Sequence, residues 1–170
     1  MDLKQYIVDV PDFPSPGVVF KDITPLLSHP AAFKATVDEM VEFVQTQQAT
    51  AIVAPEARGF VFASAVAYLT NTKFILVRKP GKLPRPVDEV EYTLEYGTSK
   101  LEMQKGDLIP ADRVVIIDDI LATGGTIDAI VELVENQGST IVGIEFLADI
   151  TKLHDQELNK KYKVKSLITY

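Results

Sequence analysis

The sequence predicts an α/β fold, in which one domain is built on a mostly parallel twisted sheet flanked by helices. Short apolar runs rich in β-branched residues alternate along the chain with segments whose apolar residues recur at helical spacing. One run, residues 114–117, is an unbroken Val-Val-Ile-Ile, as expected of a parallel strand buried on both faces. The 170 residues contain no internal repeat and are an ordinary size for one domain. We therefore expect residues 1–170 to form a single unit.

The first half of the chain contains two helix-and-strand pairs. A helix is expected after Pro30, because apolar residues there share one helical face: Phe33, Val37, Met40, Val41 and Val44. A strand follows at residues 51–55. The second pair is a helix at about residues 60–69 and a strand at residues 74–77.

The second half repeats the alternation. A strand is expected at residues 113–117, followed by a helix that begins at Thr126 and carries apolar residues at helical spacing. Gly138 stands where the C-terminal cap of that helix belongs. A strand at residues 141–147, a short helix near 155–161 and a last strand at 164–168 complete the sheet.

Composition narrows the class of protein. Hydrophobic residues make up 46% of the chain and charged residues 24%, which is typical of a globular protein. The net charge of −7 argues against nucleic acid as the main partner, because the cations that a phosphate backbone requires cluster mainly in one short segment. We find no apolar run long enough to cross a membrane and no secretory leader pattern. The absence of cysteine excludes disulfides and thiolate catalysis, so we expect a cytoplasmic protein.

The most informative segment is residues 114–126, where an apolar strand runs into two acids and then into a loop of small residues. The loop offers backbone N–H groups and hydroxyls, with glycines where a Cβ would block a phosphate, and the next helix points its N-terminus at that anion. Two carboxylates would repel the phosphate unless they bind something else, such as ribose hydroxyls and a divalent cation. The plain alternative is a polar loop between a strand and a helix. Walker and dinucleotide-binding patterns are absent.

Residues 114–126 resemble the phosphoribosyl pyrophosphate (PRPP) motif of type I phosphoribosyltransferases. The resemblance implies that Asp118 and Asp119 bind the ribose hydroxyls of PRPP. It also implies that the following loop binds the 5′-phosphate through Ala122, Thr123, Gly124, Gly125 and Thr126. The resemblance further implies a homodimer and a Mg²⁺ ion held by substrate oxygens and waters, with no direct protein ligand.

A second segment of interest follows the strand at residues 51–55. Glu56, Ala57, Arg58 and Gly59 place a cation and a glycine at a strand-to-helix turn, on the sheet edge where open α/β folds bind ligands. A surface arginine at a helix start is the plain alternative. The resemblance implies a pyrophosphate-binding loop containing a cis peptide bond, which we predict between Glu56 and Ala57.

Basic residues concentrate in residues 78–86. The resemblance implies that Arg78, Lys79 and Lys82 bind pyrophosphate together with Arg58. A solvated basic turn is the alternative. The long stretch at residues 78–105 is expected to form a flexible lid, whose residues 91–97 and 100–103 alternate like the arms of a hairpin.

Within this lid, Glu95 is our candidate for proton transfer to or from the base, and Tyr96 is expected to pack beside it. The plain alternative for Glu95 is a solvated hairpin residue. Neither His29 nor His154 is a convincing catalyst, because neither has an evident acid or nucleophile partner in the sequence.

Residues 11–27 resemble the hood segment of the adenine-specific members of the family, so we expect residues 1–30 to form a hood over the base. By this resemblance, Phe20 stacks on adenine while the main chain of Val19 and Lys21 reads its edge. Phe20 could instead be a core residue. Two departures stand out, because many relatives have Arg at Lys21 and Ser at Ala57.

The resemblance therefore implies transfer of the phosphoribosyl group from PRPP to adenine N9, giving AMP and pyrophosphate. The expected catalytic residues are Glu95, Arg58, Asp118 and Asp119. Two alternatives remain open: transfer to an oxopurine (xanthine, guanine or hypoxanthine), which would change only the hood, and a non-catalytic PRPP-sensing regulator.

Overall fold

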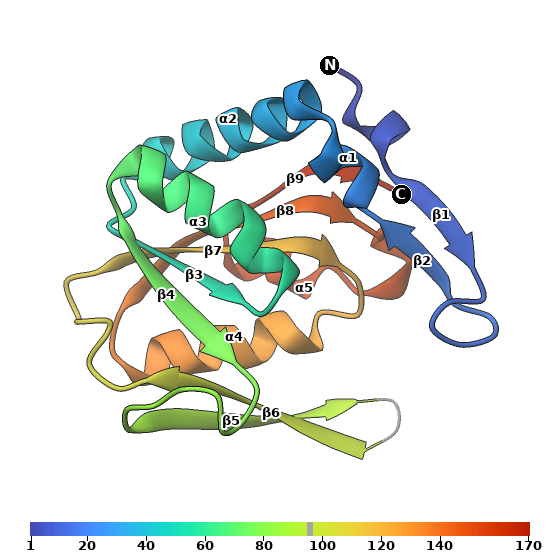
Figure 1. The fold of residues 1–170 in the computed structure, drawn as a ribbon. Helices are drawn as coiled ribbons and strands as arrows, with labels where there is room; N and C mark the ends of the chain where they lie inside the picture. The colour runs from blue at the N-terminus through green and yellow to red at the C-terminus, as the bar shows by residue number, and fades with distance from the viewer. Residues whose placement is uncertain (95–96) are drawn as a thin grey trace.

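The central sheet of the computed structural model runs in the order β5-β6-β4-β3-β7-β8-β9, for the residues that the structure describes, 1–94 and 97–170 (Figure 1). From β4 to β9 neighbouring strands are parallel, whereas β6 is antiparallel to β4 and β5 is antiparallel to β6. The strands of this sheet are β3 (Ala51–Pro55), β4 (Lys73–Arg78), β5 (Val87–Leu94), β6 (Gly97–Gln104), β7 (Arg113–Leu121), β8 (Thr140–Asp149) and β9 (Val164–Thr169).

Helices cover both faces of the sheet, with α2 and α3 on one face and α4 on the other (Figure 1). Side chains of β3 alternate between two cores: Ile52 packs in the cluster shared with α2 and α3, and Val53 packs in the cluster shared with α4. The helices are α1 (Thr24–Ser28), α2 (Pro30–Thr46), α3 (Arg58–Thr70), α4 (Gly125–Asn136) and α5 (Glu157–Lys161), with short 3-10 turns η1 (Leu3–Tyr6) and η2 (Thr151–Leu153). None of the helices in the described ranges combines the length and the hydropathy that a bilayer crossing requires.

The predicted α/β class is confirmed, and each expected helix and strand of the sheet is present. The strand at Ala51–Pro55 has the predicted bounds. Gly138 follows α4 with a φ of 79°, the left-handed conformation that a C-terminal cap requires.

One boundary was wrong. We expected Asp118 and Asp119 to leave the sheet, but β7 continues to Leu121 and both acids belong to it. The reason is that β8 extends beyond the end of β3 and keeps pairing with β7, so that Asp118 lies opposite Phe146 and Ile120 opposite Ala148.

Two hairpins flank the carboxyl end of the sheet (Figure 1). The N-terminal hairpin consists of β1 (Val8–Pro11) and β2 (Val19–Asp22), which form a separate two-stranded sheet in the described chain. The second hairpin is formed where the arms were predicted, but β5 already begins at Val87 and Gly97 belongs to β6. It is also more regular than expected, since β6 extends the central sheet from β4.

Candidate active site

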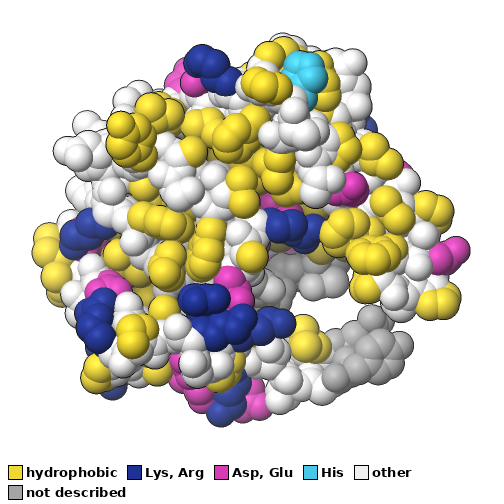
Figure 2. All heavy atoms as spheres, in the orientation of Figure 1, with side chains coloured by type: hydrophobic (Ala, Val, Ile, Leu, Met, Phe, Trp, Pro, Cys, Tyr) yellow, Lys and Arg dark blue, Asp and Glu magenta, His cyan; other side chains and the backbone are white. Residues whose placement is uncertain are grey.

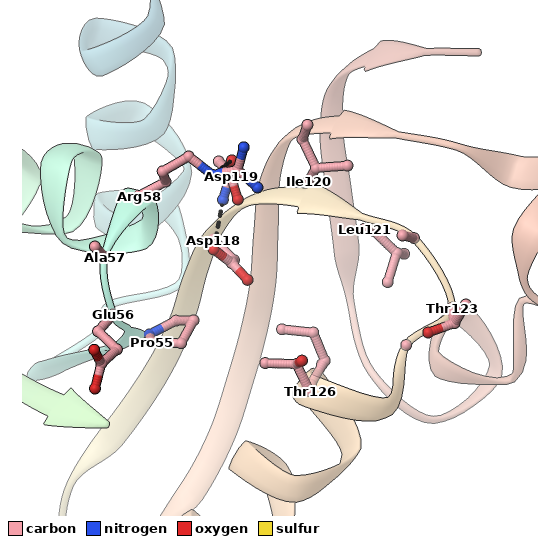
Figure 3. Close-up of a pocket in the computed structure, with 13 residues that line it drawn as sticks. Pro55, Glu56, Ala57, Arg58, Asp118, Asp119, Ile120, Leu121, Thr123 and Thr126 are labelled. Carbon is pink, nitrogen blue, oxygen red and sulfur yellow. Dashed lines mark hydrogen bonds and ion pairs between the residues drawn. The ribbon is translucent and has the colours of Figure 1, made fainter. Parts of the chain in front are cut away.

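The carboxyl ends of β3 and β7 lie side by side and open into a cavity of about 250 Å³ (Figure 3). One wall is the turn from β3 into α3, with Glu56, Ala57 and Arg58. The opposite wall is the end of β7 and the loop into α4, from Asp118 to Ile127. The two segments that the sequence singled out, more than 50 positions apart, therefore form one site.

The two aspartates have different surroundings because neighbouring residues of a strand point to opposite faces. Asp118 points into the cavity, and its Oδ1 accepts a hydrogen bond of 2.8 Å from the N–H of Asp119 (Figure 3). Asp119 is buried and turns toward α3, where its Oδ2 lies 2.8 Å from Arg58 Nε. The Arg58 N–H does not aim at this oxygen, so the pair is held by charge and leaves Oδ2 without an aligned donor.

The ionised form of the Asp118 carboxyl group is disfavoured in the folded protein. Although part of the residue is exposed, burial of its carboxyl group raises the pKa well above its ordinary value, and the charge of Asp119 raises the pKa further. The Asp119 N–H and the Arg58 charge only partly offset these effects. A carboxylate in this position is stabilised by a cation or by hydroxyl donors entering the cavity.

Gly59 provides the space that Asp118 occupies. A Cβ on Gly59 would lie 3.0 Å from Asp118 Oδ1, 3.0 Å from Pro55 Cδ and 3.3 Å from the carbonyl oxygen of Ile117. Two of these neighbours are rigid parts of β3 and β7. Glycine at the start of α3 is thus required by the close approach of this helix to β7.

The loop between β7 and α4 presents an anion-binding surface. Gly124 has a φ of 92°, which favours glycine, and it directly precedes α4. No side chain caps this end of α4, so the first backbone N–H groups of the helix remain available to a ligand. Thr123, Gly124 and Thr126 line the cavity. The expected phosphate loop therefore places uncapped backbone N–H groups at the edge of the cavity.

The Glu56–Ala57 peptide bond is cis, which confirms the prediction for this turn. The Glu56 carboxylate turns away from Asp118 toward the end of β4 (Figure 3), where it accepts hydrogen bonds from the Lys79 N–H and from Lys82 Nζ. Arg78 Nε lies 3.4 Å from the same carboxylate. Burial alone would raise the pKa of Glu56, but these hydrogen bonds and charges outweigh it and lower the pKa. Figure 2 shows Lys and Arg side chains gathered on this part of the surface.

Phe20 of the N-terminal hairpin reaches the same site through Arg58. The Arg58 guanidinium carbon lies 4.9 Å from the centroid of the Phe20 ring, and Phe13 packs edge-on against Phe20 at 5.1 Å. Phe20 is only partly buried and belongs to neither core cluster, so the structure does not favour the alternative of a core residue. A second cavity of about 760 Å³ lies between this hairpin and β5, lined by Val19, Tyr92 and Thr126 among others. Figure 2 shows the surface hollowed between the two hairpins.

Comparison with known proteins agrees with this geometry. The family model described as "Phosphoribosyl transferase domain" matches residues 22–169, which is most of the chain. This chain belongs to the phosphoribosyl transferase family.

Within the family, the resemblance to adenine phosphoribosyltransferases is confirmed over the full length. The chain is 59% identical to adenine phosphoribosyltransferase of Mesoplasma florum over 170 residues, which cover 100% of both chains. The crystal structure of adenine phosphoribosyltransferase from Thermoanaerobacter pseudethanolicus superimposes with a TM-score of 0.95 at 43% identity, covering 99% of this chain and 98% of that one. The Saccharomyces cerevisiae enzyme, solved with an imino-altritol bisphosphate and adenine, has a TM-score of 0.91 at 32% identity and covers 98% and 96%.

The remaining residues considered from the sequence of this phosphoribosyltransferase are the two lid residues and the two histidines. Glu95 and Tyr96 lie outside the described residues. His29 caps α2, since its Nδ1 accepts from the Ala32 N–H at 3.3 Å. His154 does have an acid partner that the sequence did not indicate: its Nε2 lies 2.7 Å from Asp149 Oδ1. Because the Gln156 N–H donates to Nδ1, this pair anchors the segment after β8.

The described residues, 1–94 and 97–170, contain no group of three or more side chains placed to hold a metal ion. The cavity nevertheless fits a divalent cation that brings its own ligands. Asp118 has a raised pKa beside a second acid, and Asp119 Oδ2 lacks an aligned donor. Both features favour a cation nearby, whose coordination would come from substrate oxygens and water.

Proposed function

We propose that this chain transfers the 5-phosphoribosyl group of PRPP to N9 of adenine and releases AMP and pyrophosphate. The observation that carries the proposal is the meeting of three parts at one cavity: the acids of β7, the open N-terminus of α4 and the cationic turn after β3. Adenine as the acceptor is supported by full-length similarity to adenine phosphoribosyltransferases.

The sugar phosphate is held by β7 and the loop that follows it. Asp118 and Asp119 accept hydrogen bonds from the ribose hydroxyls. These bonds stabilise the ionised form of Asp118 and so oppose the effects that raise its pKa. The 5′-phosphate lies at the N-terminus of α4 and is bound by the loop residues Ala122, Thr123, Gly124, Gly125 and Thr126.

Pyrophosphate lies toward the turn after β3 and the end of β4. Arg58, Arg78, Lys79 and Lys82 supply positive charge for the leaving group, and the main chain at Ala57 lines its cavity. Glu56 contributes by organising these cations, because its carboxylate holds the Lys79 N–H and the Lys82 ammonium. When bound with PRPP, Mg²⁺ would neutralise pyrophosphate charge, while Asp118 and Asp119 face it through water and ribose oxygens.

The base is bound by residues 1–30, which act as a hood. Phe20 offers a ring face for stacking, and β2 is an edge strand of its two-stranded sheet in the described chain. Alternate residues of such a strand direct their main-chain groups to the same side, so Val19 and Lys21 present theirs together. A C=O that accepts from the exocyclic amine of adenine and an N–H that donates to its ring nitrogen would be mismatched with an oxopurine.

The chemical step exchanges two bonds at C1 of the ribose. The bond to the pyrophosphate oxygen breaks as the bond to adenine N9 forms, and positive charge develops on the sugar beside Asp118 and Asp119. The N9 proton leaves to a base, for which Glu95 is the candidate. Residues 78–105 act as the lid that excludes water from this step.

Two further properties come from the family resemblance. We infer that the chain works as a homodimer in the cytoplasm, so that cations of a neighbouring subunit add to the pyrophosphate site. Light scattering coupled to gel filtration measures the subunit number directly.

The proposal is tested by incubating the protein with PRPP and Mg²⁺ and each of adenine, hypoxanthine, guanine and xanthine, and measuring nucleotide and pyrophosphate by chromatography. We expect AMP from adenine and little product from the oxopurines. The double variant Asp118→Asn, Asp119→Asn serves as the matched inactive control. Preferential use of an oxopurine would overturn the adenine assignment, and pyrophosphate release with none of the four bases would overturn transferase activity.

A further inference from the structure

Tyr170 is firmly attached to the end of β8. Its backbone N–H donates to the carbonyl oxygen of Asp149 at 2.9 Å, and its own carbonyl oxygen accepts from Thr151 Oγ1 at 2.9 Å. The residue after Asp149 is tied in turn to the acid-bearing strand, because the Ile150 N–H donates to the carbonyl oxygen of Leu121 at 2.9 Å. The Tyr170 backbone is thus fixed through β8 to the end of β7, the strand that carries Asp118 and Asp119.

The ring meets a lysine of the hood. Lys21 Nζ lies 3.9 Å from the centroid of the Tyr170 ring and 2.7 Å from Asp9 Oδ1. The Lys21 side chain is only 10% exposed, so its ammonium group has exchanged most of its water for these two partners. Lys4 Nζ also lies 4.2 Å from the ring centroid, but it projects from η1 and not from the hood strand.

Side-chain contacts of this kind connect the hood to the rest of the molecule. Hairpin β1–β2 forms its own sheet, and within the described residues no strand of the central sheet pairs with it. Asp9 and Lys21 are register partners across this hairpin, so their ion pair stiffens the hairpin itself, and the Tyr170 ring connects it to the rest of the molecule. A cavity of about 550 Å³ beside Lys21 and Tyr170 leaves room for the hairpin to tilt without that connection.

We propose that Tyr170 is a positioning residue for base recognition, which acts through Lys21 to fix the main chain of β2 against the purine edge. The inference rests on the proposed function of the hood. Phe20 and Lys21 are neighbours in β2 and point to opposite faces, so one face of the strand stacks on the base while the other is clamped by Tyr170. Burial raises the pKa of the Tyr170 phenol, as do the charges of Asp9 and Asp2, so the ring stays neutral and able to bind cations.

The kinetic test compares three variants with the unmodified chain. Tyr170→Leu keeps an apolar side chain but removes the ring, and we expect the KM for adenine to rise roughly tenfold, as for a partly desolvated cation–π contact. The KM for PRPP and kcat should stay within about twofold. Tyr170→Phe retains the ring and should restore the adenine KM. Lys4→Met removes the other lysine on the same ring and is the matched control, with little effect on adenine.

A second readout is independent of turnover. Hydrogen exchange measured by mass spectrometry should show faster exchange at residues 18–22 in Tyr170→Leu than in Tyr170→Phe, at equal melting temperature. Failure of the unmodified chain to make AMP would refute the proposed function, whereas this exchange difference reports on the clamp alone. An adenine KM unchanged by Tyr170→Leu, an equal loss for adenine and PRPP, or identical exchange in the two variants would each overturn the inference.

Discussion

Arg58 and Asp119 form an ion pair between the first turn of α3 and the end of β7, with 2.8 Å between Nε and Oδ2. The same guanidinium lies against the Phe20 ring, with its carbon 4.9 Å from the ring centroid. One side chain therefore links the strand proposed to hold the ribose to the hairpin proposed to hold the base. Arginine suits this position because its planar group can stack and pair at once.

This bridge predicts that Arg58→Lys is a damaging substitution. A compact ammonium can keep the charge near Asp119 but cannot also stack on Phe20. We expect kcat/KM to fall about 10²-fold for both adenine and PRPP, in line with loss of one preorganised donor at a reaction centre. Steady-state kinetics measures this. Arg85→Lys is the matched control and should behave as the unmodified chain. Arg85 lies just before β5 and forms an ion pair with Asp107. Loss confined to one substrate would contradict the bridging role.

We predict that substitution of Asp118 increases stability and decreases activity. At neutral pH the raised pKa of Asp118 means that its ionised form is unfavourable in the folded protein, so Asp118→Asn should raise the melting temperature. Activity should fall at least about 10²-fold, because the amide is a poorer acceptor for the ribose hydroxyls.

The control is Asp119→Asn, which should raise the melting temperature less than Asp118→Asn does, because it relieves the charge on Asp118 but also leaves Arg58 without its charge partner. Differential scanning calorimetry and AMP formation measure the two properties. A melting temperature that rises more in Asp119→Asn than in Asp118→Asn would contradict the assignment of strain to Asp118.

Gly59 is predicted to be intolerant of even a methyl group. Gly59→Ala would bring a Cβ to 3.0 Å from Asp118 Oδ1 and 3.3 Å from the Ile117 carbonyl oxygen, so α3 or the carboxylate must shift. We expect the protein to fold and kcat/KM for PRPP to fall roughly tenfold or more, the effect of a small misplacement of a catalytic group. Ser64→Ala on the exposed face of α3 is the control. A fully active Gly59→Ala variant would show that this clearance is unimportant.

Glu145 predicts the pH dependence of stability. Its side chain is fully buried in β8, and burial raises the pKa from 4.5 to about 8, although Lys165 at 3.5 Å partly offsets the shift. The folded state keeps a proton on Glu145 that the unfolded state releases. The stability that this proton contributes is therefore present below about pH 4.5 and is lost as pH rises through about 8. Between these values the free energy of unfolding should fall by up to about 1.4 kcal/mol per pH unit from this residue.

Urea unfolding at several pH values measures that slope. Glu145→Gln should flatten the profile and make the protein more stable than the unmodified chain near pH 8. Glu132→Gln, an exposed acid on α4, is the control and should leave the slope in place. A slope retained in Glu145→Gln would assign the effect to other groups.

The sequence alone determined the fold class and singled out the two segments that line the main cavity. The unbroken apolar run at 114–117 indicated a buried parallel strand, and the acids and glycines after it indicated a sugar-phosphate site, because local backbone and charge requirements are written in adjacent residues. The resemblance extended this to the cis bond at Glu56–Ala57. The end of β7 was misjudged, since strand length depends on the neighbour that pairs with it.

Only the tertiary structure decided which distant side chains meet. The pairs Arg58–Asp119, His154–Asp149 and Lys21–Tyr170 have no signature in the sequence. The burial of Glu145 beside Lys165 could likewise not be predicted from the sequence. An acid in a strand is expected to face solvent until the packing of a helix over that face is known. Contacts between residues far apart depend on how elements pack in space, and it is packing that sets the pKa of Asp118, the room at Gly59 and the angle of the N-terminal hairpin.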